Sequence, residues 1–152
     1  MMAHHSAIDV AKWFLNRNNV EAMISEAEDI SNLKLQKLLY YAQGAVLAIT
    51  GDPLFDDCIV AWEHGPVVID VYHKYKGNGR NGIPFNDDEP SEEYTEEEQS
   101  ILESVYEEFG QYSAWKLRNM THKETPWLST KKNDVIRLDV IEKYFKEHYV
   151  AA

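Results

Sequence analysis

The sequence predicts a mainly α-helical fold, a compact single-domain bundle of about six helices with one small β-hairpin or ribbon. Three observations support this fold class. Apolar residues recur at helical steps of three and four along most of the chain. β-Branched and aromatic residues gather in one short run, Cys58 to Trp62. The length of 152 residues suits a single core, so we expect one domain over residues 1–152, with residues 1–6 flexible.

The helices of the N-terminal half are predicted from a cap and from periodicity. Ser6 suits the N-cap of a first helix, which we expect to end at the polar run 16–19, with a further short helix within residues 20–27. The most regular apolar stripe runs from Leu35 to Ile49 and predicts a deeply packed central helix. Gly44 disfavours a helix interior by about 1 kcal/mol relative to alanine, which suggests that another backbone approaches closely there.

The middle of the chain predicts the β-structure. Gly51-Asp52-Pro53 ends the central helix, and Cys58 to Trp62 then favours a short strand. Pro66 lacks an N–H and suits the first residue of a helix, so we expect a helix to begin there and to stop at the glycine-rich loop 77–82. Residues 83–85 are expected to add a strand to the earlier one.

The C-terminal half predicts three more helices from their caps. Thr95 and Glu98 form the pattern of a capping box, and Gly110 suits the left-handed residue after that helix. Ser113 is expected to cap a short helix, and the segment around Asp139 and Glu142 is expected to cap the last one.

The charge is strongly acidic, at -11. A phosphate backbone is bound by Lys and Arg, so we expect no direct nucleic-acid binding. Eight acids gather in one run without a base among them: Asp87, Asp88, Glu89, Glu92, Glu93, Glu96, Glu97 and Glu98. Such a run could dock a basic partner, but it is more typical of a solvated loop that leads into the start of a helix. We favour the solvated loop.

Composition also excludes several classes of protein. No apolar run reaches the roughly 20 residues of a membrane helix, and the N-terminus lacks the pattern of a secretory signal. We therefore expect a cytoplasmic protein with no membrane partner. Cys58 is the one cysteine, which excludes an internal disulfide and a thiolate zinc site.

Two histidines invite a catalytic interpretation. His64 precedes Gly65-Pro66, and His122 lies in the run 121–127. A small metal-dependent hydrolase would combine them with an acid such as Asp70. However, no HExxH, GxSxG or CxxC spacing is present, so we favour imidazoles that hydrogen-bond to nearby loops. We expect no enzyme, no catalytic or metal-binding residue and no cofactor.

The aromatic residues point to protein binding. Four tryptophans and nine tyrosines exceed what a small helical core requires, and such side chains are favoured at interfaces. For Trp62 and Trp127, core packing and partner contact both remain open. The candidate partner-binding residues are Trp62, His64, Gly65, Pro66, Tyr72, Thr121, His122, Pro126 and Trp127.

Four sequence runs together resemble a known family. They are Leu33-Lys34-Leu35-Gln36-Lys37-Leu38-Leu39-Tyr40-Tyr41-Ala42-Gln43, Gly51-Asp52-Pro53-Leu54-Phe55, Ala61-Trp62-Glu63-His64-Gly65-Pro66-Val67 and Thr121-His122-Lys123-Glu124-Thr125-Pro126-Trp127. In this order and spacing they resemble the Panacea domain of SocA-like and phage-associated GepA-like antitoxins. The resemblance spans nearly the whole chain.

The resemblance implies a mostly helical antitoxin of a type II toxin–antitoxin system, which binds a cognate protein toxin and neutralises it. It implies no catalytic residue, and it makes the tyrosine-rich helix and the turn at 62–67 mainly structural. Alternatives are an adaptor that delivers a toxin to a protease and a phage protein that binds a host factor. Many members carry an added DNA-binding domain, for which this chain has no room, so autoregulation by this chain alone is not expected. The oligomeric state is not indicated.

Overall fold

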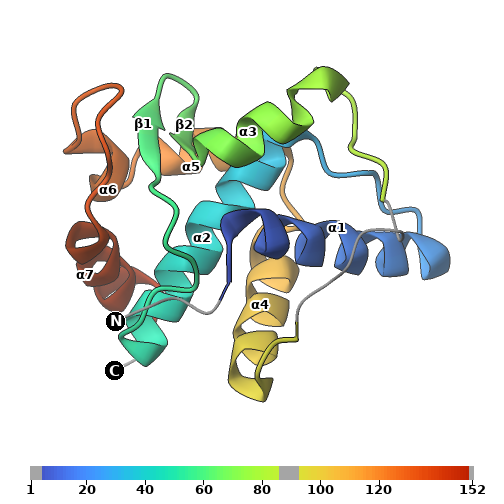
Figure 1. The fold of residues 1–152 in the computed structure, drawn as a ribbon, viewed down its shortest axis with the longest axis horizontal. Helices are drawn as coiled ribbons and strands as arrows, with labels where there is room; N and C mark the ends of the chain where they lie inside the picture. Colours follow the sequence, from blue (N-terminus) through green and yellow to red (C-terminus); the bar gives the residue numbers. More distant parts are fainter. Residues whose placement is uncertain (1–4, 86–92, 151–152) are drawn as a thin grey trace.

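The computed structural model describes residues 5–85 and 93–150. Within these ranges it has seven α-helices, one 3-10 helix and a two-stranded antiparallel sheet, which confirms the predicted mainly α bundle with a hairpin (Figure 1). The elements are α1 (Ala7–Ile24), α2 (Asn32–Thr50), β1 (Val60–Trp62), β2 (Gly65–Val67), α3 (Ile69–Tyr75), η1 (Lys76–Asn78), α4 (Glu96–Phe109), α5 (Ala114–Thr121), α6 (Thr125–Leu128) and α7 (Leu138–His148).

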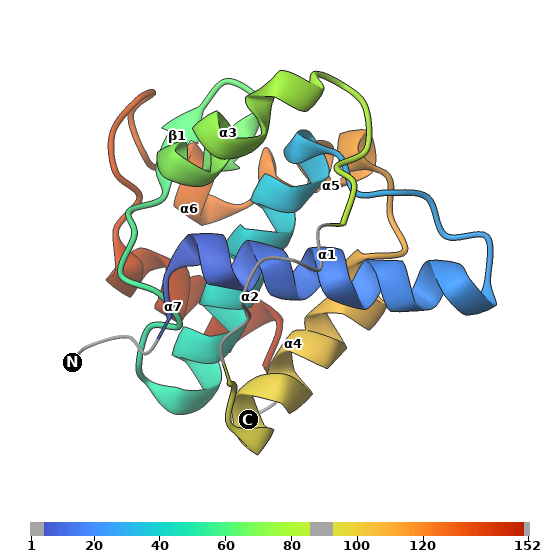
Figure 2. The same ribbon diagram turned by 45° about the vertical axis from the view of Figure 1, so that its right-hand side comes forward.

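Helix α2 is the centre of the bundle. Helix α1 crosses it, α4 and α7 flank its C-terminal half, and α3, α5 and the hairpin gather at its N-terminal half (Figures 1 and 2). Fourteen of its 19 residues are buried, so the helix is enclosed on nearly all sides and not along one stripe alone. Ile49, at the end of the predicted stripe, is 47% exposed.

Helix α1 does not end where the sequence predicted. It begins after the Ser6 cap as expected, but it continues through the polar run 16–19 to Ile24 and absorbs the short helix predicted within 20–27. Tertiary contacts explain this, because Asn18 donates to the Glu28 carbonyl oxygen and accepts from Tyr106, while Arg17 pairs with Glu103. These bonds favour the helix more than the weak propensity of asparagine opposes it.

Gly44 is a point of close approach, but by a side chain and not by a backbone. A Cβ atom built there would lie 2.4 Å from the ring of Phe145 on α7. The glycine therefore lets an aromatic ring lie directly against α2. Gly51 ends the helix, as predicted, and its φ of 83° lies in the left-handed region.

The hairpin corrects two predictions. Pro66 lies in β2 opposite Ala61, and the next helix begins three residues later at Ile69. Residues 83–85 do not join β1: the Ile83 amide donates to the Ile30 carbonyl oxygen, and Val135 pairs with the free edge of β1. A later segment of the chain thus takes the position that was predicted for residues 83–85.

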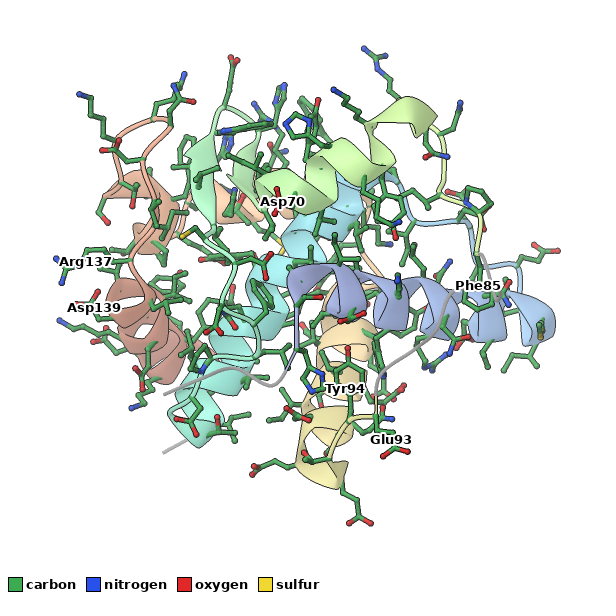
Figure 3. All side chains as sticks on the ribbon, viewed as in Figure 1. Asp70, Phe85, Glu93, Tyr94, Arg137 and Asp139 are labelled. Atoms are coloured by element: carbon green, nitrogen blue, oxygen red, sulfur yellow. The ribbon has the colours of Figure 1, made fainter. Side chains whose placement is uncertain are left out.

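In the C-terminal half the first two caps are confirmed and two finer predictions are wrong. Thr95 and Glu98 form the capping box of α4, and Ser113 caps α5. Gly110 has a φ of -64° and is not left-handed. Helix α7 begins after Arg137 without a side-chain cap, and Asp139 instead pairs with Arg137 at 2.7 Å (Figure 3).

His5, the first described residue, contacts the segment that leads into α4. His5 is buried, stacks on Tyr94 at 4.0 Å between ring centroids and lies 3.1 Å from a carboxylate oxygen of Glu98. Glu93 and Tyr94 lie just before α4 (Figure 3). Of the acidic run, residues 87–89 and 92 lie outside the described residues, as do residues 1–4 of the segment expected to be flexible.

Candidate functional site

Polar side chains of α2 hold the other sequence runs in place. Gln43 is fully buried, and its side-chain oxygen accepts from the amides of Leu54 and Phe55 at 2.8 and 3.3 Å. Its amide nitrogen donates to the Phe55 carbonyl oxygen at 2.7 Å. Because a buried amide must satisfy both its donor and its acceptor, this residue fixes the path of residues 51–55.

Two further residues of α2 fix the hairpin. The side-chain oxygen of Gln36 accepts from the Val68 amide at 2.9 Å, and the Lys37 amino group donates to the Pro66 carbonyl oxygen at 3.0 Å. Lys37 is fully buried, and burial, with Arg118 nearby, lowers its pKa to about 7. Gly65 covers it at φ 110°, where a Cβ atom would lie 2.8 Å from Cε of Lys37.

The last sequence run is anchored by a buried carboxylate. Glu124 accepts from the hydroxyl groups of Tyr40 and Tyr41 at 2.9 Å and from that of Tyr149 at 2.5 Å. Burial raises the pKa of Glu124, while the three hydrogen bonds oppose that rise. All four sequence runs therefore meet on α2, and most of their polar residues form internal contacts.

Beside this framework lies a groove of about 970 Å³. It is bounded by the hairpin, the N-terminal part of α2, the segment from α3 to residue 80 and the start of α5. Its aromatic and charged lining residues are Trp62, Glu63, His64, Tyr72, Lys76, Arg80, Trp115 and Lys132, together with Lys37. We call this the hairpin groove.

Aromatic rings form part of the lining of the hairpin groove. Trp62 meets Tyr72 edge to face at 5.0 Å between ring centroids, and Trp115 is 56% exposed. The Arg118 guanidinium lies 4.3 Å from the centre of the Trp115 ring and donates to Nδ1 of His64 at 3.0 Å. Large exposed rings held by neighbours lose little entropy on binding, which suits a protein interface.

The structure brings three of the nine candidate binding residues together in the groove: Trp62, His64 and Tyr72. The remaining six do not line the groove, and they are Gly65, Pro66, Thr121, His122, Pro126 and Trp127. Four of these six are buried, and the exceptions are His122 and Trp127. Partner contact by the nine residues stays a prediction.

His122 and Trp127 form a pair beside the hairpin. Their rings stack at 4.1 Å between centroids, and Trp127 donates from its indole nitrogen to the Trp62 carbonyl oxygen at 2.7 Å. Burial lowers the pKa of His122. The pair thus links α6 to β1 and supports the shape of the hairpin.

Sequence reasoning missed four groove residues: Lys76, Arg80, Trp115 and Lys132. The three bases lie in loops or in a 3-10 turn, whose position in space no periodic pattern predicts. Trp115 did carry a signal, because Leu117 and Thr121 form the buried side of α5 and Trp115 lies off that face.

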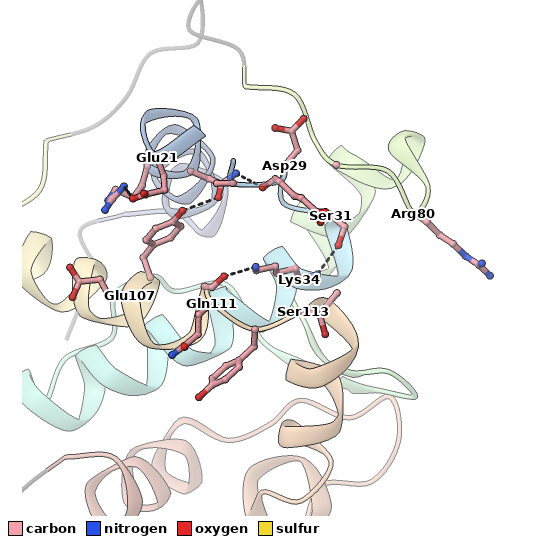
Figure 4. Close-up of a pocket in the computed structure, with 17 residues that line it drawn as sticks. Glu21, Asp29, Ser31, Lys34, Arg80, Glu107, Gln111 and Ser113 are labelled. Atoms are coloured by element: carbon pink, nitrogen blue, oxygen red, sulfur yellow. Dashed lines mark hydrogen bonds and ion pairs between the residues drawn. The ribbon is translucent and has the colours of Figure 1, made fainter. Parts of the chain in front are cut away.

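A second, polar cavity of about 830 Å³ lies between α1, the start of α2 and the end of α4 (Figure 4). The Lys34 amino group donates to the Gly110 carbonyl oxygen at 2.6 Å, and Tyr106 donates to Asn18 at 2.8 Å. Arg80 is on its rim and points away from it (Figure 4). Its polar groups bond to one another and link three helices.

The described residues contain no group of three or more histidine, cysteine or acidic side chains placed to hold a metal ion. Asp70, the acid considered with the two histidines, is exposed at the start of α3 (Figure 3). No helix within residues 5–85 and 93–150 combines the length and apolarity that crossing a membrane requires.

Comparison with known proteins identifies the family. The family model described as "Antitoxin SocA-like, Panacea domain" matches residues 35–128. Antitoxin SocA of Caulobacter vibrioides (strain NA1000 / CB15N) is 50% identical over 50 residues, which are 33% of this chain and 27% of that relative's length. No solved structure matches. Because the family model covers more than half of the chain, from α2 through α6, this protein belongs to the SocA-like antitoxin family with a Panacea domain.

Proposed function

We propose that this protein is the antitoxin of a type II toxin–antitoxin system and that it neutralises a cognate protein toxin by direct binding. The observation that carries the proposal is the family match over residues 35–128. The hairpin groove supports direct binding, because it presents Trp62, Tyr72 and Trp115 on a framework fixed by internal hydrogen bonds. A preformed aromatic surface loses little entropy when a partner docks.

The same contacts favour binding over catalysis. Lys37 and Glu124, two buried ionisable side chains of the framework, are bonded to the protein itself. His64 accepts from Arg118, and the His122 ring is stacked on Trp127. A general acid or base needs a polar atom within reach of substrate. Nδ1 of His64 is bonded to Arg118, and Nε2 of His122 is buried. The proposal therefore assigns no catalytic residue and no cofactor.

The proposal extends to the organisation of the chain and its place in the cell. Residues 1–152 form one Panacea-type domain that acts in the cytoplasm, where its toxin is made. The toxin is its partner, and nucleic acid is not.

Co-expression tests this function. The chain is produced with the protein encoded by the adjacent open reading frame, and growth and co-purification are measured. We expect the pair to co-purify and growth to be restored. The toxin's half-life separates the two modes of action: an unchanged half-life indicates masking, and a shortened one indicates delivery to a protease. If the two proteins neither co-purify nor restore growth, the antitoxin function is wrong.

A pair of matched variants locates the contact surface. Trp115→Glu places a charge in the hairpin groove, whereas Leu128→Glu places one on α6, outside the groove lining. The two side chains have similar exposure, 56% and 59%, so both variants should fold. We expect Trp115→Glu to abolish growth rescue and Leu128→Glu to retain it. The opposite result would place the toxin on the α6 side.

A further inference from the structure

We propose that the hairpin groove recognises a short acidic segment of the partner that also carries a large apolar or aromatic side chain. This inference rests on the proposed function and names the chemistry of the partner. Three kinds of observation carry it: the charge of the groove, the hydrogen bonding of the hairpin and the exposed rings.

The groove is basic on the surface of an acidic protein. Its exposed charged lining residues are three bases, Lys76, Arg80 and Lys132, and one acid, Glu63. The whole chain has 15 bases against 26 acids. A local excess of bases in a hollow between low-dielectric walls concentrates positive potential there, which attracts a carboxylate-bearing partner.

One cation beside the groove adds to this potential. The Arg118 guanidinium lies over the Trp115 ring and donates to His64 and Asn119, which supply no negative charge. Its field therefore acts on whatever occupies the groove, more strongly than it would in water.

The hairpin itself offers little backbone for strand addition. In β2, Pro66 has no N–H to donate, and its carbonyl oxygen accepts from Lys37. On the other side of β1, Ala61 exchanges hydrogen bonds with the backbone of Asp134 and Asn133. A partner is therefore recognised by its side chains and not by extending the sheet.

The exposed rings and the net charge define the segment further. Trp115 and the Trp62–Tyr72 pair present apolar surface next to the bases, which suits an apolar side chain flanked by Asp or Glu. A long polyanion such as RNA would extend beyond the groove and meet a protein of net charge -11. A short acidic segment, in contrast, fits within the hairpin groove and does not reach the acidic surface around it.

Peptide selection tests this. Twelve-residue peptides from a random library are selected on the full chain and on a variant with Lys76→Glu, Arg80→Glu and Lys132→Glu. The control variant carries Arg137→Glu at the N-cap of α7 and Lys143→Glu and Lys146→Glu on α7. It removes the same number of exposed bases outside the groove. The dissociation constant of each selected peptide is then measured at low and high NaCl.

We expect the unchanged protein to select peptides rich in Asp or Glu with an aromatic residue. These peptides should bind the groove variant at least tenfold more weakly, bind the control variant within threefold and weaken as NaCl rises. Selection of basic peptides, equal binding to the groove variant, or groove-dependent binding of a twelve-nucleotide single-stranded DNA without acidic peptides would each overturn the inference.

Different results would contradict the antitoxin function and the acidic-segment inference. If the chain rescues growth and co-purifies with the toxin, but the groove variant does both equally well, the antitoxin function stands and the acidic-segment inference is wrong. If no adjacent toxin is neutralised, the function is wrong, and the peptide selection still measures the preference of the groove. Circular dichroism of both triple variants confirms that each has folded.

Discussion

The Tyr40 hydroxyl group donates to a carboxylate oxygen of Glu124 at 2.9 Å, across 84 residues of sequence. Tyr41 and Tyr149 donate to the same carboxylate. A buried carboxylate is costly unless it is hydrogen-bonded, so the three hydroxyl groups and the acid stabilise the fold as a unit. This contact joins α2, the turn before α6 and the residue after α7.

Glu124→Leu should lower the free energy of unfolding by about 3 kcal/mol, because it leaves three tyrosine hydroxyl groups without their acceptor. Urea unfolding of the purified protein measures this. Glu147→Leu, at an exposed position of α7, is the control and should change stability by less than about 0.5 kcal/mol. Equal effects of the two substitutions would mean that the tyrosine contacts contribute nothing.

The Glu124 carboxylate should also make stability depend on pH. Burial raises its pKa in the folded state above the ordinary value of 4.5. Between those two pKa values the folded chain holds a proton that the unfolded chain has lost. The part of the stability that comes from this protonation is therefore complete below pH 4.5 and is lost as the pH rises through the folded pKa.

Glu124→Gln cannot titrate and should flatten this part of the profile. Urea midpoints between pH 4 and pH 8 for the original protein and for this variant test the sign. If the urea midpoints of the two proteins change with pH in parallel, the Glu124 carboxylate is not the source of the pH dependence.

Local sequence signals predicted most of the fold. The Ser6, Thr95 and Ser113 caps were all found because a cap is a contact between near neighbours in sequence. The end of α1 was missed because Asn18 is held by Tyr106, 88 residues away. Propensity carries no information about such a partner.

The candidate site was predicted less completely for the same reason. Trp62 and His64 were found because they flank a Gly-Pro turn, but Pro66 was assigned to a helix when its partner across the hairpin, Ala61, could not be known. Lys76 in η1 and Lys132 in a loop are brought together only by the fold. Local patterns thus indicate the turn, whereas the basic character of the groove is a property of the tertiary structure.

Lys37 should produce the opposite pH dependence to Glu124. An unfolded lysine has a pKa near 10.5, whereas burial lowers the pKa of Lys37 to about 7. Between these values the unfolded chain binds a proton that the folded chain does not, so stability should rise as the pH increases from about 7 toward 10.5. Lys37→Met should remove that rise, and Lys143→Met, at an exposed position, should retain it.

Thermal unfolding at pH 7, 8 and 9 measures the effect. If Lys37→Met keeps the full slope, the amino group is charged in the folded protein and the lowered pKa is wrong. The buried position makes methionine a suitable replacement, since it fills a similar volume and loses one hydrogen bond to Pro66.

Gly44→Ala should destabilise the protein by about 2 kcal/mol, although alanine is the better helix former by about 1 kcal/mol. The added Cβ would lie 2.4 Å from the Phe145 ring, so either the ring or α7 must move. Gly77→Ala is the matched control, because a Cβ there has no neighbour within 4 Å. Chemical denaturation compares the two variants.

A second substitution identifies the cause of that loss. In a Phe145→Leu background the ring is gone, so Gly44→Ala should cost less than it does in the original protein. If the double-mutant cycle shows no coupling between positions 44 and 145, the effect of Gly44→Ala comes from the helix backbone and not from contact with the Phe145 ring. Because the ring lies directly on the helix, we expect coupling of about 1 kcal/mol or more, in the direction that relieves the clash.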